Sequence, residues 1–267
     1  MERTALDRRL TAELQQRFGK RFSTGDKARN AYCHRVTLLK AQPPDAVLTL
    51  TTTEEVVMAA ALCRTYDVPI VPFGAGTSLE GQVNAPRGGI AFDFGTMNKI
   101  LNIDPQNLTA TVQPGVTRED LNRALEPHGL FFPVDPGANA TLGGMTSTRA
   151  SGTNAVKYGT MRTNTMALKV ITADGTVTRI GTAASKSAMG YNLVQLFVGA
   201  EGTLGLIVEL TLRLVPLPAS IGSGRSAFPD LETATRAVVE TTRAGVDFAR
   251  IELLDEPAIQ AVNRYSG

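Results

Sequence analysis

The sequence lacks several residue types and patterns on which common classes of protein depend. Its 267 residues include no tryptophan, two cysteines and two histidines. Cys33 and Cys63 have neither C-x-x-C spacing nor the density of a disulfide scaffold, which fits a reducing compartment or simple core packing. No group of histidines and carboxylates has the spacing of metal ligands. We therefore expect neither a disulfide framework nor a metal site.

Long apolar runs and runs of one charge are also missing. The net charge is +2, and lysines and arginines do not cluster, so nothing indicates binding to nucleic acid. No segment has the pattern of a signal peptide or the length of a membrane span. At the N-terminus, Leu6, Leu10, Leu14 and Phe18 recur every four residues and predict an amphipathic surface helix. We expect a soluble, cytoplasmic protein.

The order of the expected elements indicates an α+β fold. Strands alternate with few helices, Thr52 with Glu55 offers a capping box, and Asp174-Gly175 marks a hairpin turn. The expected strands cover residues 46–50, 68–73, 90–94, 100–103, 108–112, 166–172, 176–180, 204–215 and 248–254. The expected helices cover residues 1–18, 52–66, 117–128, 231–243 and 256–263, and residues 192–198 fit either a helix or a strand.

Two proline-marked boundaries divide the chain. Residues 1–42 form an expected N-terminal helical segment, and residues 43–218 a large domain that ends at Pro216 and Pro218. Residues 219–267 begin a further unit that is too short to be a domain by itself.

The stretch PFGAGTSLEGQ, residues 72–82, has the character of a phosphate-binding loop but fits neither common motif. Gly76 and Gly81 have the spacing of a nucleoside-triphosphate loop, yet Gln82 follows where that motif has lysine. Leu79 stands where a dinucleotide fingerprint has its third glycine. The loop is expected between two strands, whereas both motifs lead into a helix. An anion here would be held by backbone amides.

Two further glycine-rich segments follow. Residues 132–165 are rich in Gly, Ser, Thr and Asn, and residues 198–205 carry a third glycine cluster. A long surface loop is the plain structural interpretation of the first segment. The alternative is a ligand cradle, in which small residues let the backbone approach a large ligand and Arg149 pairs with a phosphate. Three such turns together favour a large non-covalent cofactor that carries one diphosphate.

The blocks PFGAGTSLEGQ, DPGANATLGG, STRASGTNAVKYGTMR and GYNLVQLFVGAEGTLGLI, in this order and spacing, support a resemblance to a known family. Together they resemble the FAD-binding domain of the vanillyl-alcohol oxidase/p-cresol methylhydroxylase (PCMH-type) flavoprotein superfamily. Within it, the chain is most similar to FAD-linked D-lactate dehydrogenases and the large subunit of glycolate oxidase. The resemblance covers residues 43–217. It implies a PCMH-type FAD-binding fold of two α+β subdomains, followed by the beginning of a truncated α+β cap domain at residues 219–267.

The resemblance also implies a set of FAD-binding residues. The first turn would wrap the diphosphate, the second block would follow the diphosphate and flavin, and the last block would contact the adenosine and flavin edges. In order, these residues are Pro72, Phe73, Gly74, Ala75, Gly76, Thr77 and Ser78; Asp135, Pro136, Gly137, Thr141, Gly143 and Gly144; Thr148, Arg149, Ser151 and Gly152; Tyr158, near the flavin; and Glu201, Gly202 and Ile207. Some members attach FAD to a histidine where this chain has Thr77, so the resemblance implies non-covalent FAD.

The implied activity is oxidation of a D-2-hydroxy acid, of the D-lactate or glycolate type, to the 2-oxo acid. The implied partners are this small acid and an electron acceptor such as a cytochrome or a quinone, and a quinone would bring peripheral contact with the inner membrane. In the family, the substrate-binding residues, the metal ligands and the base belong to the cap domain and beyond, so the catalytic residues are not identified here. Two alternatives stay open: an FAD-binding fragment or subunit that needs a partner chain, and an ether-lipid synthase of the same superfamily.

Overall fold

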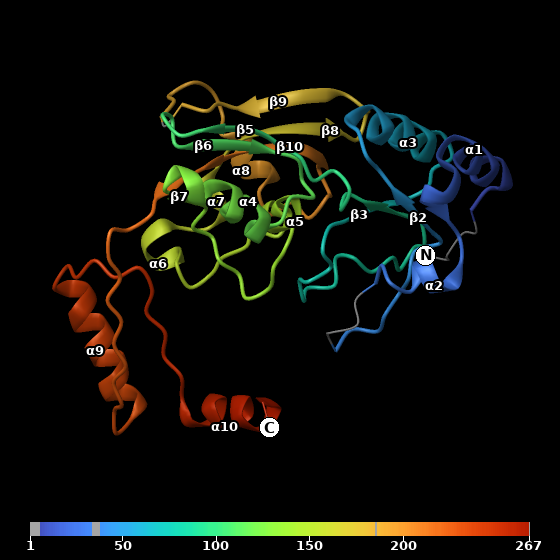
Figure 1. Cartoon of the computed structure of the whole chain (residues 1–267). Coiled ribbons are helices and arrows are strands. Elements are labelled where there is room, and N and C mark those ends of the chain that lie inside the picture. The colour runs from blue at the N-terminus through green and yellow to red at the C-terminus, as the bar shows by residue number, and fades with distance from the viewer. Residues whose placement is uncertain (1–5, 34–37, 185, 267) are drawn as a thin grey trace.

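The computed structural model describes residues 6–33, 38–184 and 186–266 (Figure 1). Its first part is built on a four-stranded sheet of order β1-β2-β4-β3. Strands β2 (Ala46–Thr49), β4 (Ile90–Asp93) and β3 (Ile70–Phe73) run parallel, and β1 (Phe22–Ser23) adds an antiparallel edge. The helices of this part are α1 (Arg8–Phe18), η1 (Gly19–Arg21), α2 (Asp26–Arg29) and α3 (Thr53–Thr65).

The second part is built on a five-stranded antiparallel sheet of order β5-β6-β10-β8-β9. Its strands are β5 (Ile100–Asp104), β6 (Thr109–Val112), β8 (Thr165–Thr172), β9 (Val177–Gly181) and β10 (Gly205–Arg213). A small pair, β7 (Leu130–Phe131) with β11 (Val215–Pro216), lies beside it. The helices are α4 (Arg118–Leu125), η2 (Glu126–His128), α5 (Leu142–Ser147), α6 (Ala155–Tyr158), α7 (Met161–Asn164) and α8 (Leu193–Phe197).

The predicted α+β fold of two subdomains is confirmed. The five-stranded sheet joins the subdomains, because its central strand β10 contributes side chains to the cores of both. Along β10, Ile207 and Leu210 belong to the core beneath α4 and α5, while Leu206 and Val208 belong to the core of the first part. A register irregularity between Ile207 and Glu209 interrupts the pairing with β8 at this point. Because both faces of this sheet are packed, the ends of its strands are fixed relative to the first subdomain.

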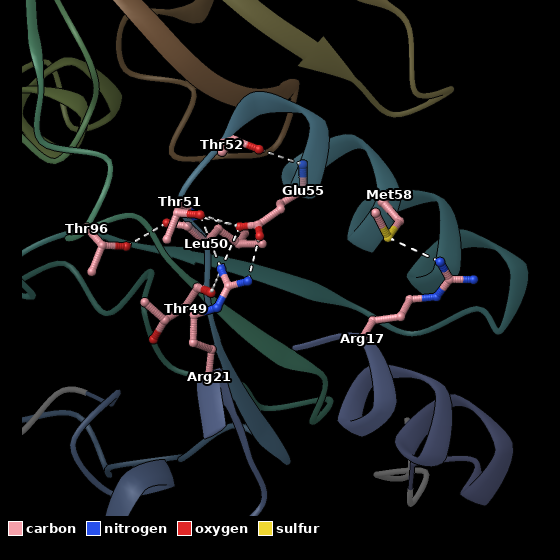
Figure 2. Close-up of polar contacts among 9 residues, drawn as sticks. All are labelled: Arg17, Arg21, Thr49, Leu50, Thr51, Thr52, Glu55, Met58 and Thr96. Atoms are coloured by element: carbon pink, nitrogen blue, oxygen red, sulfur yellow. Dashed lines mark hydrogen bonds and ion pairs between the residues drawn. The ribbon is translucent and has the colours of Figure 1, made fainter. Parts of the chain in front are cut away.

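The start of α3 is held by a polar network that also fastens the N-terminal segment (Figure 2). The Thr52 hydroxyl accepts a hydrogen bond from the Glu55 amide at 3.2 Å, as the capping box predicts. The Glu55 carboxylate instead accepts from the Thr51 amide at 2.9 Å and pairs with both terminal nitrogens of Arg21 at 2.6 Å. The Arg21 guanidinium and the Thr51 donors lower the pKa of Glu55 to about 2. This pair links η1 to the beginning of α3.

Several local expectations from the sequence are confirmed. Helix α1 buries Leu10, Leu14 and Phe18, and residues 192–198 contain a short helix, α8. Thr117 caps α4, and Gly129 ends the following turn in the left-handed conformation. Residues 1–5, the beginning of the expected N-terminal helix, lie outside the described residues. No helix in the described ranges is long and apolar enough to cross a membrane.

The expected strand at residues 248–254 is wrong. This segment is irregular and lies between α9 (Leu231–Arg243) and α10 (Glu256–Ser266). A strand needs a neighbour for its backbone hydrogen bonds, and within the described residues no strand lies alongside this segment. Figure 1 shows α9 and α10 projecting from the two subdomains as an extended arm.

Candidate cofactor-binding site

A cavity of about 460 Å³ lies where the two subdomains meet, and all three glycine-rich segments contribute to its wall. Its size is in the range of roughly 300–1,000 Å³ that is usual for ligand sites. The predicted site residues that line it are Pro72, Phe73, Gly74, Ala75, Gly76, Thr77, Ser78, Pro136, Gly137, Thr141, Gly143, Gly144, Thr148, Arg149, Ser151, Glu201, Gly202 and Ile207.

The first wall is the loop that leaves β3 at Phe73. It leads through turns to β4, and this agrees with the strand, loop and strand order expected from the sequence. Gly76 has a φ of +65°, and a Cβ on it would lie 2.5 Å from Cζ of the Phe73 ring. A Cβ on Gly74 would collide with the Thr141 hydroxyl. The loop can follow this path because both positions lack side chains, which leaves its backbone close to the cavity.

The second wall is the turn into α5. The Gly143 amide donates to the Pro114 carbonyl at 2.8 Å, and a Cβ on Gly143 would lie 2.5 Å from Cβ of Pro114. Thr141 precedes α5 and is 5% exposed, yet its hydroxyl has no hydrogen-bond partner within the described chain. The side-chain oxygen of Gln82, which also lines the cavity, is buried and unpaired as well. Buried side-chain oxygens usually have a hydrogen-bond partner, so these two, beside one cavity, are available to a ligand or to water.

The third wall is the turn between α8 and β10, which is bonded to the end of α5. The amides of Gly199 and Glu201 donate to the carbonyls of Thr146 and Ser147, both at 3.0 Å. Glu201 has a φ of +51° and Arg149 a φ of +52°, a conformation that residues other than glycine seldom adopt. Such backbone persists where surrounding contacts fix it, commonly at ligand sites.

Three predicted site residues do not line the cavity. The Asp135 carboxylate accepts hydrogen bonds from the Thr153 hydroxyl at 2.7 Å and the Asn154 amide at 2.8 Å. Gly152 packs so closely on Asp135 that a Cβ would collide with it. Tyr158 packs edge-to-face on Phe131, with ring centroids 5.6 Å apart. These contacts brace the glycine-rich segment from behind, and contact of these residues with a cofactor stays a prediction.

Folding brings to the cavity some residues that the sequence did not indicate. Gln82 lies inside the first glycine block, where it only ruled out a nucleoside-triphosphate loop. Its side-chain amide can form hydrogen bonds with a ligand, and this was the signal that could have indicated a place in the site. Phe94 and Pro114 come from the ends of other strands and carry no local pattern that marks a ligand site. The titratable side chains in the wall are Glu80, Arg149 and Glu201.

Neither histidine of the chain is among the described residues that line the cavity. His128 is the last residue of η2, and Gly129 follows it as the expected helix end. His34 lies outside the described residues. Among the described residues, no group of three or more His, Cys, Asp and Glu is placed to hold a metal ion.

Comparison with known proteins identifies the class to which this fold of two subdomains and its cavity belong. Residues 44–181 match the family model described as FAD binding domain, and residues 217–267 match the model described as FAD linked oxidases, C-terminal domain. The chain belongs to this family of FAD-binding proteins.

Curated relatives lie among dehydrogenases and oxidases. The chain is 46% identical to a probable mitochondrial D-lactate dehydrogenase of Danio rerio, over 91% of this chain and 50% of the relative. It is 39% identical to the mitochondrial D-lactate dehydrogenase (cytochrome) of Arabidopsis thaliana, over 99% of this chain and 45% of the relative. It is 37% identical to glycolate oxidase subunit GlcD of Bacillus subtilis, over 92% and 53%. The chain thus spans about half the length of the curated relatives it matches.

Among solved structures, an alkyldihydroxyacetonephosphate synthase superposes with a TM-score of 0.79 at 24% sequence identity, over 94% of this chain and 48% of that chain. This likeness shows the fold alone.

The residues present fit FAD, the cofactor of the family. The close approach of Gly74, Gly76 and Gly143 to their neighbours leaves backbone rather than side chains at the wall. The Arg149 guanidinium has no ion-pair or hydrogen-bond partner within the described chain, so it is free to pair with a phosphate. The unpaired oxygens of Thr141 and Gln82 supply hydrogen-bonding groups for the polar edges of the cofactor.

Proposed function

We propose that this chain is an FAD-dependent oxidoreductase that converts a D-2-hydroxy acid, of the D-lactate or glycolate type, to the 2-oxo acid. The observation that carries the proposal is the similarity, across 91% and 99% of this chain, to proteins named as D-lactate dehydrogenases. The glycolate oxidase subunit adds a second 2-hydroxy acid of the same chemical class.

Bound FAD supplies the acceptor for the hydride that leaves the α-carbon of the acid. The part of this chain is to bind and orient the cofactor. The amides of the loop at residues 72–78 hold the diphosphate, and Arg149 neutralises its charge. The turns at residues 141–144 and 201–207 enclose the remainder and exclude water from that side of the cavity.

The proton of the substrate hydroxyl needs a base. The carboxylates in the described wall, Glu80 and Glu201, lie on the loop that begins at β3 and on the turn before β10. We assign these turns to cofactor binding, and we propose that the base comes from the FAD-linked oxidase C-terminal domain, whose family model matches residues 217–267.

A second candidate is an FAD-binding unit that reaches activity only with a further polypeptide segment. The arm formed by α9 and α10 supports this second candidate. No residue of α10 is buried, and Ile259, Val262 and Tyr265 are 46%, 56% and 94% exposed. Apolar side chains at this spacing on one helix form a face that partner elements usually cover. The ether-lipid synthase alternative rests on a likeness of fold alone, and no observation of the site favours it.

A titration of the purified, FAD-loaded chain distinguishes these candidates. D-lactate, glycolate and D-2-hydroxyglutarate are added separately without oxygen, and the visible flavin absorbance is followed. Bleaching by one of these acids supports the dehydrogenase and identifies its substrate. A flavin that none of them bleaches supports the unit that needs a further segment, and it contradicts independent turnover by this chain.

The electron acceptor and the location are part of the same proposal. One relative is named as a cytochrome-linked enzyme, and we propose a cytochrome or a quinone as the acceptor. We place the protein in the cytoplasm, at the surface of the inner membrane if the acceptor is a quinone. Reoxidation of the reduced protein by cytochrome c or by a soluble quinone analogue tests the choice of acceptor.

A further inference from the structure

The N-terminal segment lies before the part of the chain that matches the FAD-binding family model, yet it reaches the base of the first glycine loop. Strand β1 pairs with β2 at the edge of the sheet, and α2 follows it. Arg29, the last residue of α2, donates to the Pro44 carbonyl at 2.7 Å. Tyr32, three residues further on, lies beside the ends of β3 and β4.

Tyr32 contacts both of these strand ends. Its hydroxyl donates to the Asp93 carboxylate at 2.8 Å, at the last residue of β4. Its ring packs against that of Phe73, the last residue of β3, with centroids 4.6 Å apart and planes inclined at 54°. Phe73 and Asp93 are paired neighbours in the parallel sheet. One half-buried side chain therefore joins the two strands at the point where the glycine loop begins.

The Phe73 ring in turn supports the loop. Gly76 lies so close to this ring that an added Cβ would be 2.5 Å from Cζ. Gly76 is in the middle of the loop that we assign to the diphosphate. A shift of the Phe73 ring therefore changes where the loop amides point.

Asp93 fixes the other side of the contact. Its second oxygen accepts from the Gly95 amide at 2.8 Å, and the oxygen that Tyr32 contacts also accepts from the Thr49 hydroxyl at 3.4 Å. Burial and the adjacent Asp93 carboxylate raise the pKa of Tyr32, so Tyr32 stays a neutral donor at physiological pH. Asp93 does not line the cavity, and its charge is satisfied by donors behind the loop.

We propose that Tyr32 is a positioning residue for the diphosphate loop, acting through Phe73 and Asp93. The inference rests on the assignment of FAD to the cavity. It means that the N-terminal segment, which makes none of the described cavity wall, sets the affinity for the diphosphate half of the cofactor.

The test uses the full chain stripped of FAD and three probes. FAD carries flavin and diphosphate, ADP carries the diphosphate without flavin, and riboflavin carries flavin without diphosphate. For Tyr32→Ala we expect the Kd for FAD and for ADP to rise about tenfold, which corresponds to ~1.4 kcal/mol. The Kd for riboflavin stays at the wild-type value. Tyr32→Phe keeps the ring and loses one hydrogen bond, so its Kd for ADP rises by a smaller factor, about threefold.

Tyr66 provides the matched control. It is the C-cap of α3, partly buried and packed on the core of the same subdomain, and it lies away from the cavity wall. Tyr66→Ala should lower stability and leave the Kd for ADP unchanged.

Equal weakening of all three probes by Tyr32→Ala, or the same loss for ADP in Tyr66→Ala, would overturn the inference. If Tyr32→Ala does not fold, Tyr32→Phe decides, since a wild-type Kd for ADP in that variant contradicts the proposal. No hydroxy acid enters this assay. A failure here is therefore distinct from a failure of the proposed dehydrogenase activity.

Discussion

Replacement of Gly76 by valine tests the first glycine loop most severely. Gly76 has a φ of +65°, which costs an L-residue roughly 1–2 kcal/mol. The new Cβ would lie 2.5 Å from Cζ of Phe73, and overpacking of this kind typically costs about 1–3 kcal/mol. The loop escapes both costs only by leaving its present path, so the loss falls on cofactor affinity. A total of roughly 2–5 kcal/mol corresponds to a rise of about 30-fold to 4,000-fold in the Kd for FAD.

The assay is titration of the FAD-free protein with FAD, followed by flavin fluorescence, with the melting temperature measured in parallel. Gly129→Val is the matched control. Gly129 has nearly the same φ, +66°, but nothing lies within 4 Å of its added Cβ and it is outside the cavity wall. It should lose stability and keep its FAD affinity. A folded Gly76→Val protein with the wild-type Kd would refute the assignment of this loop to the diphosphate.

Three other changes test separate parts of the structure. Arg149→Ala should raise the Kd for FAD by about fivefold to tenfold, less than Gly76→Val, because it removes one ion pair and leaves the path of the loop unchanged. Calorimetry should show that the difference in Kd between this variant and the wild type becomes smaller at high salt. Thr141→Val should leave the stability of the FAD-free protein unchanged or higher, since the hydroxyl is unpaired there, and should weaken FAD binding; thermal melts with and without FAD compare the two. The pKa of Glu55 is lowered from 4.5 to about 2, so the stabilisation that its carboxylate gives the fold is present above pH 4.5 and is lost as the pH falls towards 2. Glu55→Gln should lower the free energy of unfolding by about 1–3 kcal/mol at pH 7, measured by urea unfolding. It should also flatten the fall of this free energy between pH 5 and 2. An unaltered acid limb in that variant would contradict the role of the ion pair with Arg21.

The parts of the fold that the sequence predicted are those set by local chemistry. Thr52 and Thr117 cap their helices because a threonine hydroxyl can reach an amide three residues ahead. The turn at Asp174-Gly175 forms because glycine accepts a positive φ, here +89°, and the Asp174 carboxylate accepts from the Thr176 amide at 3.1 Å. The place of the glycine loop between two strands could likewise be predicted, since turn residues and apolar runs alternate along that stretch.

The parts that could not be predicted depend on contacts between distant segments. The segment at 248–254 is rich in apolar residues as a strand would be, but a strand forms only beside another strand. Asp135 and Tyr158 stand in glycine-rich blocks beside residues that line the cavity, and their contacts with Thr153 and Phe131, which no local pattern marks, appear only in the folded chain. Tyr32 lies outside every glycine block, and no local pattern connects it with Phe73, 41 positions further on.

The central claim is that this chain binds FAD without a covalent bond in the cavity between its two subdomains. The most direct measurement is reconstitution with FAD, removal of free cofactor, and acid precipitation of the protein. The account predicts a yellow protein with close to one FAD per chain, and all of the flavin in the supernatant after precipitation. A protein that stays colourless after reconstitution, or flavin that remains with the precipitate, would contradict it.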